Sequence, residues 1–319
     1  MKTLKNILRL SLIAMIALSL TGCASFMGNM MGESFLYPPE QPFPKTPEDY
    51  GISYKDVAFK TDDNLKLSGW LLNESADKII IMTHFGYRAN RFGYQVKHQP
   101  GPIKPYKEEI EFVKVARRLT DAGYGVLMYD LRNHGISEKT KSGAGTGGID
   151  ESNDVIAAVK FITTNESTKG KDIGLLSYCM GANATFFAQA ENTELFSTNV
   201  KALVAMQPLT NGDFLCAYGY DRDSKVFDIA ETKFKEQTGY SLDAPVLEQV
   251  DKVVTPTLLC QGRKDPWTNM DFVNAVYEKL PVEKEMYWME EPEHRFDGYN
   301  WFSDHPEKML EWFNKYLKN

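Results

Sequence analysis

The stretch Gly174-Leu-Leu-Ser-Tyr-Cys179-Met-Gly181 decides the fold of this 319-residue chain. An apolar run typical of a buried strand passes through a tight turn straight into a helix-like sequence. Cys179 stands in that turn, with the small residues Ser177 and Gly181 two positions away on either side. A strained strand-to-helix turn pushes a nucleophile into the open and requires small neighbours. Centring the pattern on Ser177 would place Leu175 in a crowded position, so the sequence favours Cys179 as the nucleophile.

Strand-like and helix-like segments alternate on both sides of this turn. The strands are predicted at residues 54–60, 65–72, 78–83, 125–130, 172–177, 201–206, 257–261 and 285–289. The helices are predicted around residues 110–119, 150–163, 180–190, 270–279 and 309–317. This alternation predicts an α/β fold with a mostly parallel sheet covered by helices on both faces. Residues 209–250 are polar and rich in aromatic side chains, and they predict a small cap inserted over the strand ends.

The composition excludes several classes of protein. Apolar residues make up 43% and charged residues 25%, which is typical of a globular chain and not of a disordered one. The net charge of −7 argues against a nucleic-acid partner held by phosphate contacts. Four cysteines in a chain of this length do not make a disulfide scaffold. No zinc-binding spacing occurs among the histidines and cysteines, so we expect neither a metal nor a cofactor.

The first 22 residues are typical of a targeting signal. Three basic residues precede an apolar run from Leu10 to Leu20 that is too short to span a bilayer. Leu20-Thr21-Gly22-Cys23 resembles the lipobox of bacterial lipoproteins. That resemblance implies cleavage before Cys23 and acylation of its thiol, which would anchor the chain to a membrane. The alternative is a plain signal peptide that happens to contain a cysteine.

The resemblance to lipoproteins also implies a location. Ala24 follows the cysteine where an aspartate would suggest retention at the inner membrane, so we expect the cell envelope and, within it, the outer membrane. Residues 23–51 are rich in Met, Gly and Pro, and their composition predicts a semi-extended, lipid-anchored tether.

From about residue 52 to residue 319 the chain resembles an α/β-hydrolase. The G-x-S-x-G motif of that family appears here as Ser177-Tyr178-Cys179-Met180-Gly181. A cysteine in the nucleophile position resembles the dienelactone hydrolases, although those proteins have glycine where Ser177 stands. The match beyond the turn does not carry over their lactone substrate.

The resemblance also implies a catalytic acid and base in the chain order nucleophile, acid, histidine. Asp265 follows a predicted strand in Gly262-Arg-Lys-Asp265, which resembles the family's G-x-x-D segment. His294 follows the last predicted strand, where the family places its base. We therefore expect Cys179, Asp265 and His294 to form a triad in which Asp265 orients the imidazole. An ordinary turn aspartate and an ordinary loop histidine are the alternatives.

The oxyanion hole of the family uses two backbone N–H groups. One is expected from Met180, which follows the nucleophile. The other is expected after the strand at residues 78–83, where this chain inserts Phe85 between His84 and Gly86. Tyr87, next to the glycine, is the preferred donor, and Phe85 is the alternative.

Together these features predict a lipid-anchored hydrolase that cleaves a small acyl substrate, namely an ester, a lactone or a thioester. Cys179 would attack the carbonyl and form an acyl-thioester, which water then resolves. Replacement of the usual serine leaves a second hypothesis, an inactive hydrolase-fold lipoprotein that binds a ligand or partner. An acyltransferase is a third, since it differs only in the acceptor that resolves the acyl-enzyme.

Overall fold

The computed structural model describes residues 23–86, 88–99 and 106–318. Its main sheet has eight strands in the order β1-β2-β6-β3-β7-β8-β9-β10, with the strands from β6 to β10 parallel and β2 antiparallel to both neighbours. A small second sheet pairs β4 with β5. The strands are β1 Tyr54–Lys60, β2 Lys66–Leu72, β3 Lys78–Thr83, β4 Gly93–Tyr94, β5 Ile110–Glu111, β6 Gly125–Tyr129, β7 Asp172–Tyr178, β8 Val200–Met206, β9 Thr257–Gly262 and β10 Lys284–Met289. The predicted mostly parallel α/β architecture is confirmed.

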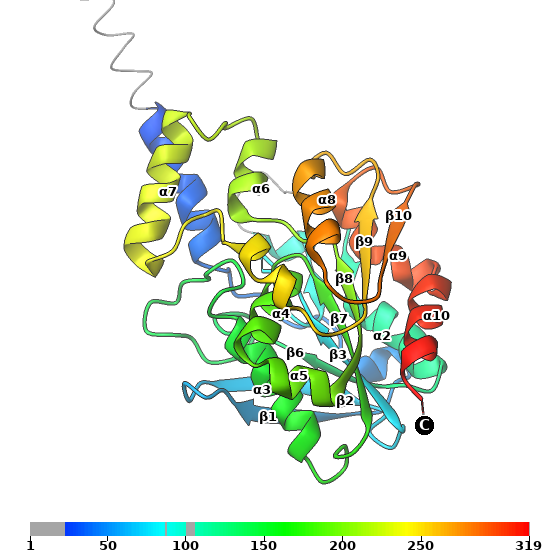
Figure 1. Ribbon diagram of the computed structural model, residues 1–319. Coiled ribbons are helices and arrows are strands. Elements are labelled where there is room, and N and C mark those ends of the chain that lie inside the picture. Colours follow the sequence, from blue (N-terminus) through cyan, green and yellow to red (C-terminus); the bar gives the residue numbers. More distant parts are fainter. Residues whose placement is uncertain (1–22, 87, 100–105, 319) are drawn as a thin grey trace, which may run out of the picture.

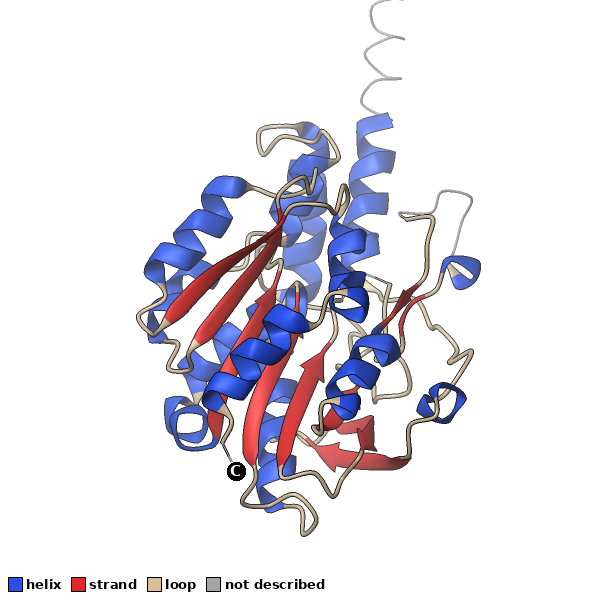
Figure 2. Cartoon of the chain, turned by 90° about the vertical axis from the view of Figure 1, so that its right-hand side faces the viewer, coloured by secondary structure: helices blue, strands red, loops and turns tan. Residues whose placement is uncertain are grey.

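Helices cover both faces of the sheet (Figure 2). One apolar core joins α2, α9 and α10 to one face, and a second core joins α3, α4, α5 and α8 to the other. Such double coverage explains why the central strands are apolar along their whole length. The longer helices are α2 Phe112–Asp121, α3 Ser152–Thr164, α4 Met180–Glu191, α5 Thr193–Asn199, α6 Asn211–Ala217, α7 Lys225–Thr238, α8 Met270–Lys279, α9 Arg295–Asp304 and α10 Glu307–Tyr316. Short 3₁₀ turns lie at η1 Pro47–Tyr50, η2 Val96–His98, η3 Val246–Glu248 and η4 Val250–Lys252.

Residues 209–250 hold α6 and α7, which lie beyond the ends of the strands beside a further helix at residues 23–36 (Figure 1). This helix, called the N-terminal helix below, buries Met31 and Leu36 against Phe227 and Phe234 of α7. The prediction of an extended tether is therefore wrong for residues 23–36. Composition suggested a tether, but the apolar surface of α7 supplies a partner for the helix that composition does not reveal.

The targeting signal predicted for residues 1–22 lies outside the described residues. Within the described part of the chain, no helix is long and apolar enough to cross a membrane. Cys23 is exposed at the start of the N-terminal helix.

The parallel strands bring the predicted site residues to one edge of the sheet. Cys179 directly follows β7, and its N–H donates to the carbonyl of Met206 at the end of β8 (2.8 Å). Asp265 follows β9, and His294 follows β10. In open α/β sheets, ligands bind at the carboxyl ends of the strands, so the functional site is expected at this edge.

Candidate active site

Cys179 occupies a strained turn between β7 and α4. Its backbone has φ 50° and ψ −111°, in the region that residues with a side chain rarely adopt. The turn persists because its carbonyl accepts hydrogen bonds from the N–H groups of Ala182 (2.9 Å) and Asn183 (3.0 Å). A Cβ at Gly181 would lie 2.6 Å from the carbonyl oxygen of Thr83, so only glycine lets α4 approach β3 this closely. The sequence requirement for a small residue two positions after Cys179 thus has a direct steric cause.

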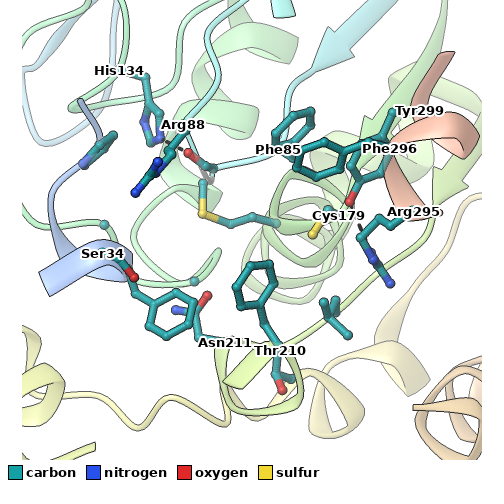
Figure 3. Close-up of a pocket in the computed structure, with 18 residues that line it drawn as sticks. Ser34, Phe85, Arg88, His134, Cys179, Thr210, Asn211, Arg295, Phe296 and Tyr299 are labelled. Atoms are coloured by element: carbon teal, nitrogen blue, oxygen red, sulfur yellow. Dashed lines mark hydrogen bonds between the residues drawn. The ribbon is translucent and has the colours of Figure 1, made fainter. Parts of the chain in front are cut away.

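The half-buried side chain of Cys179 lines a pocket at this edge of the sheet. Figure 3 shows Cys179 beside Arg295, Phe296 and Tyr299, with Ser34 across the pocket. Aromatic and aliphatic groups make up much of the remaining wall, including Phe35, Phe85, Leu209 and Phe214. An apolar pocket with a few convergent polar groups is the usual form of a small-molecule site.

The side chain of Asp265 is fully buried, and its carboxylate has several hydrogen-bond partners. It accepts hydrogen bonds from the Trp267 N–H (2.9 Å), the Thr268 hydroxyl (2.6 Å) and the Gln261 amide (3.2 Å). It also forms an ion pair with Arg295, whose Nη2 lies 2.9 Å from Oδ2. The predicted acid therefore has a cation as its partner.

Arg295, at the start of α9, holds a central place in the site. Its Nη1 donates to the carbonyl of Gln207 (2.6 Å) and to the hydroxyl of Tyr299 (3.1 Å), one turn further along α9. Tyr299 lines the pocket beside Cys179, and burial raises the pKa of its hydroxyl well above the usual value. Burial acts to lower the pKa of Arg295, but Asp265, Tyr299 and Cys179 together outweigh it and the net shift is upward. A charged guanidinium therefore stands in the wall that holds Cys179.

His294 lies near enough to Asp265 for that charge to act on its pKa, but the described residues do not form the predicted hydrogen-bonded triad. The residue is the N-cap of α9, and its Nδ1 accepts the Phe296 N–H (3.2 Å). Its ring stacks on Tyr106 with the centroids 5.0 Å apart, and no hydrogen bond joins it to Asp265 or Cys179 in the described structure. The physical reason is the capping geometry, which turns the ring back over the first turn of α9 and points the next side chain, Arg295, at Asp265.

The pKa of His294 is lowered, chiefly because the ring is partly desolvated. A neutral ring suits the bond to Phe296, since only an unprotonated Nδ1 can accept a hydrogen bond.

The predicted oxyanion donors are only partly described. Met180 is the first residue of α4, where an N–H has no partner within the helix. Its side chain lies so close over Gly86 that a Cβ there would meet Sδ at 2.4 Å. Tyr87 lies outside the described residues. Phe85, the alternative donor, is buried, and its ring stacks on Tyr299 at 4.7 Å.

Sequence reasoning missed three residues of the site, Arg295, Gln207 and Tyr299. Gln207 follows β8 with a positive φ of 48°, and its amide joins the Gly262 N–H to the Arg295 carbonyl. A signal for the other two was present, because Arg295 and Tyr299 are four residues apart and share a helix face. Among the described residues, no group of three or more acidic, histidine or cysteine side chains could hold a metal ion.

Comparisons with known proteins agree with this architecture. The family model described as alpha/beta hydrolase fold matches residues 108–227. The esterase PF2001 of Pyrococcus furiosus superimposes with a TM-score of 0.67 and 26% sequence identity, over 89% of this chain and 99% of that one. The protein has the α/β-hydrolase fold. The family match and the esterase neighbours together support an ester hydrolase.

Two further comparisons extend the likeness without adding a substrate. The dienelactone hydrolase of Anabaena variabilis superimposes with a TM-score of 0.54 and 18% identity, over 84% of this chain and 99% of that one. The uncharacterized protein YqkD of Bacillus subtilis is 26% identical over 189 residues, which are 57% of this chain. That match spans 59% of the length of YqkD.

Proposed function

We propose that this α/β-hydrolase cleaves a carboxylic ester, a lactone or a thioester, with Cys179 as the nucleophile. The observation that carries the proposal is the position of Cys179 on a strained strand-to-helix turn, with its side chain in an apolar pocket. The likeness to an esterase of the same fold supports the choice of substrate class.

The reaction would proceed in two steps. The sulfur attacks the substrate carbonyl carbon, and the negative oxygen that develops is held by the Met180 N–H and by a second N–H assigned to Tyr87. The bond to the leaving group then breaks, and the alcohol or thiol departs with a proton. Water attacks the acyl-thioester in the second step, releasing the carboxylic acid and restoring the thiol.

We assign the proton transfers to His294. Arg295 cannot accept a proton at any working pH, so it cannot act as the base. His294 would give up the hydrogen bond that it accepts from the Phe296 N–H and form one with Cys179. The loop that holds Asp265 lies next to His294, because the ring of Trp267 in that loop is 4.7 Å from the His294 ring, measured between centroids. Arg295 would stabilise the negative charge that forms during the reaction.

We further propose that the chain is held at a bacterial membrane, most simply the outer membrane, by lipid on Cys23. The lipobox-like sequence and the exposure of Cys23 support this assignment. Labelling of cells with a palmitate analogue should mark the wild type and not Cys23→Ser. Unlabelled wild-type protein would contradict the anchor.

One observation favours a second candidate function, a hydrolase fold that binds a ligand without cleaving it. The partner of Asp265 is Arg295 and not an imidazole, so the resting site lacks an assembled base. A guanidinium in the pocket wall suits binding as well as catalysis.

The deciding experiment assays the full-length protein in detergent with p-nitrophenyl esters, lactones and acyl thioesters. Cys179→Ala should lower kcat/KM by about 10³-fold, equivalent to about 4 kcal/mol, whereas Cys216→Ala on α6 should change it less than twofold. His294→Ala should lower kcat by about 10²-fold.

Activity that survives Cys179→Ala would remove the nucleophile assignment. Wild-type protein that cleaves nothing but binds acyl compounds would favour the second candidate.

A further inference from the structure

The N-terminal helix forms one wall of the Cys179 pocket. Ser34 and Phe35 from its last turn, together with Pro38, line the pocket, and Ser34 lies across it from Cys179 (Figure 3). Phe35 packs edge-on against Phe214 of α6, with the ring centroids 5.4 Å apart. The segment between the proposed anchor and the hydrolase domain is therefore part of the site.

The position of this helix is fixed by its contact with α7. Gly28 and Gly32 lie at the contact, where a Cβ would come within 2.7 Å of the Ile229 Cβ and 3.3 Å of the Ala230 carbonyl oxygen, respectively. Glycines four residues apart let two helix backbones approach closely. Glu33 adds an ion pair with Lys233.

The exposed side of the same segment is unusually apolar. Among the described residues, five large hydrophobic side chains are exposed, and three of them lie here: Phe26 (68%), Met30 (43%) and Tyr37 (44%). Cys23, Phe26 and Met30 are spaced three and four residues apart, which places them on one face of the helix. The lipid attachment point and the exposed apolar side chains thus share a face.

The distance from anchor to pocket is short. Eleven residues separate Cys23 from Ser34, and at a rise of 1.5 Å per residue this is about 16 Å along the helix. An interfacial helix buries its apolar face about 5–10 Å into the headgroup and acyl boundary. A helix seated this way would hold the pocket close to the bilayer surface.

We propose that the N-terminal helix lies on the bilayer that holds Cys23, and that the pocket it walls takes the acyl chain of a membrane-borne ester or thioester. The inference rests on the proposed function and on the proposed lipid anchor, and it adds to them a substrate class. Phe35, Phe85 and Phe214 would contact the acyl chain, with its carbonyl at Cys179.

The test uses the full-length lipoprotein in phosphatidylcholine vesicles and two substrates with one leaving group. p-Nitrophenyl butyrate is supplied in solution, and p-nitrophenyl palmitate is supplied in the vesicles. Phe26→Ser, which removes an exposed apolar group from the helix, should lower the palmitate-to-butyrate ratio of kcat/KM at least fivefold. The matched control is Ile136→Ser, since Ile136 is similarly exposed (62%) but lies in a loop after β6 and not on the N-terminal helix, and it should leave the ratio unchanged.

Two further variants test the pocket wall. Gly28→Val should push the helix from α7, and Phe35→Ala trims the wall without touching that contact, so both should lower the ratio. Ratios that stay at the wild-type value in Phe26→Ser and Phe35→Ala, with butyrate still hydrolysed, would overturn this inference and leave the proposed function standing. Wild-type protein that cleaves neither substrate would overturn both.

Discussion

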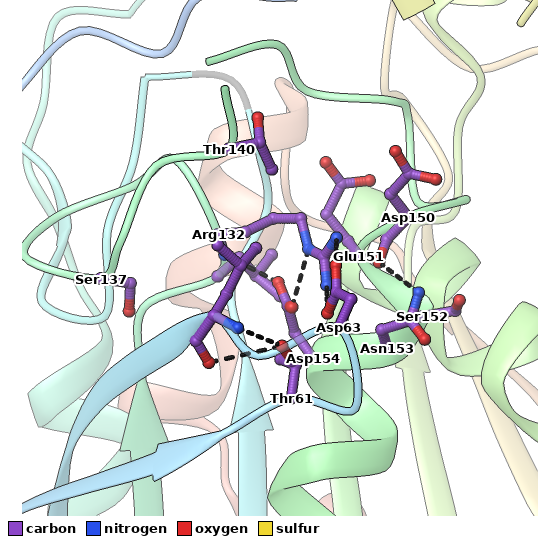
Figure 4. A network of polar contacts seen from close by, with 12 residues as sticks. Thr61, Asp63, Arg132, Ser137, Thr140, Asp150, Glu151, Ser152, Asn153 and Asp154 are labelled. Atoms are coloured by element: carbon purple, nitrogen blue, oxygen red, sulfur yellow. Dashed lines mark hydrogen bonds and ion pairs between the residues drawn. The ribbon is translucent and has the colours of Figure 1, made fainter. Parts of the chain in front are cut away.

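Two of the three buried arginine–aspartate pairs among the described residues, Arg132–Asp154 and Arg295–Asp265, differ in how many nitrogens of the arginine are hydrogen-bonded; the third pair joins Arg91 to Asp130. Arg132 donates through Nε to Asp154 (2.8 Å) and through its two terminal nitrogens to Asp63 (2.9 and 3.1 Å), as Figure 4 shows. Its backbone N–H also donates to Asp154 (2.7 Å). Two carboxylates thus share one guanidinium, and no nitrogen of its side chain lacks a partner in the described structure.

Arg295 has a single carboxylate partner, Asp265, and its buried Nε has no hydrogen-bond partner among the described residues. It also lines the pocket, whereas Arg132 does not. Buried polar atoms are nearly always paired in native proteins, so an unpaired one calls for an explanation. Arg91 also has unpaired buried nitrogens and does not line the pocket, so the position of Arg295 in the pocket wall, and not incomplete pairing alone, favours a role in the site, whereas the fully paired Arg132 favours a role in the fold.

The largest loss of stability should come from breaking the Arg132–Asp154 pair, in which every nitrogen of the arginine side chain is hydrogen-bonded. Arg132→Met leaves the fully buried Asp154 without its cation, so we expect the free energy of unfolding to fall by about 3–5 kcal/mol. The folded fraction should keep its kcat/KM within threefold. Urea unfolding measures the loss, and Lys139→Met, which removes the exposed pair with Glu40, should cost far less because water screens that pair. Equal losses in the two variants would show that the buried network has no special role.

A milder substitution compares the two arginines directly. Lysine keeps the charge but cannot reach several partners at once as the planar guanidinium does. Arg295→Lys should therefore lower kcat/KM by about 10–100-fold, which is about 1.4–2.8 kcal/mol in the transition state, while Arg132→Lys should leave it within threefold. Steady-state kinetics on one p-nitrophenyl ester measures both variants. Equal kinetic losses would remove the distinction between a structural and a functional pair.

The sequence predicted the architecture well, because each central strand is apolar on both faces. The predicted strand at residues 78–83 and the predicted helix at residues 270–279 coincide with β3 and α8. The turn at Cys179 was also predictable from the sequence, because local steric contacts require small residues on either side of it. The N-terminal helix was missed because its stability comes from α7, some 200 residues away, and not from its own composition.

The partner of Asp265 was missed for a different reason. His294 and Arg295 are adjacent, and successive residues of a helix point about 100° apart. Which of them faces Asp265 depends on the residue at which α9 begins, and the ends of a helix are uncertain by one or two residues. A shift of one residue at the N-cap decides whether the site presents an imidazole or a guanidinium.

The smallest predicted effect concerns His84, which connects the pocket to the segment that holds Arg132. His84 lies in the loop that carries Phe85 and Gly86 into the pocket, and its Nε2 accepts the N–H of Leu131, next to Arg132 (3.1 Å). Its Nδ1 donates to the Phe85 carbonyl (2.7 Å), and because Nε2 accepts a hydrogen bond the ring must be neutral. Burial, with a smaller effect from His134, lowers the pKa of His84 well below its usual value.

The sign of the pH effect follows from this shift. Below pH 6.5 the unfolded chain binds a proton at His84 that the folded chain does not, so stability falls as the solution becomes acidic. Between pH 6.5 and 5.5 this one group should cost about 1 kcal/mol, and urea unfolding at the two pH values measures it. His84→Asn should remove about that much of the pH dependence. An unchanged pH dependence in His84→Asn would mean that His84 is already protonated in the folded protein, and the hydrogen bond from Leu131 could not exist as described.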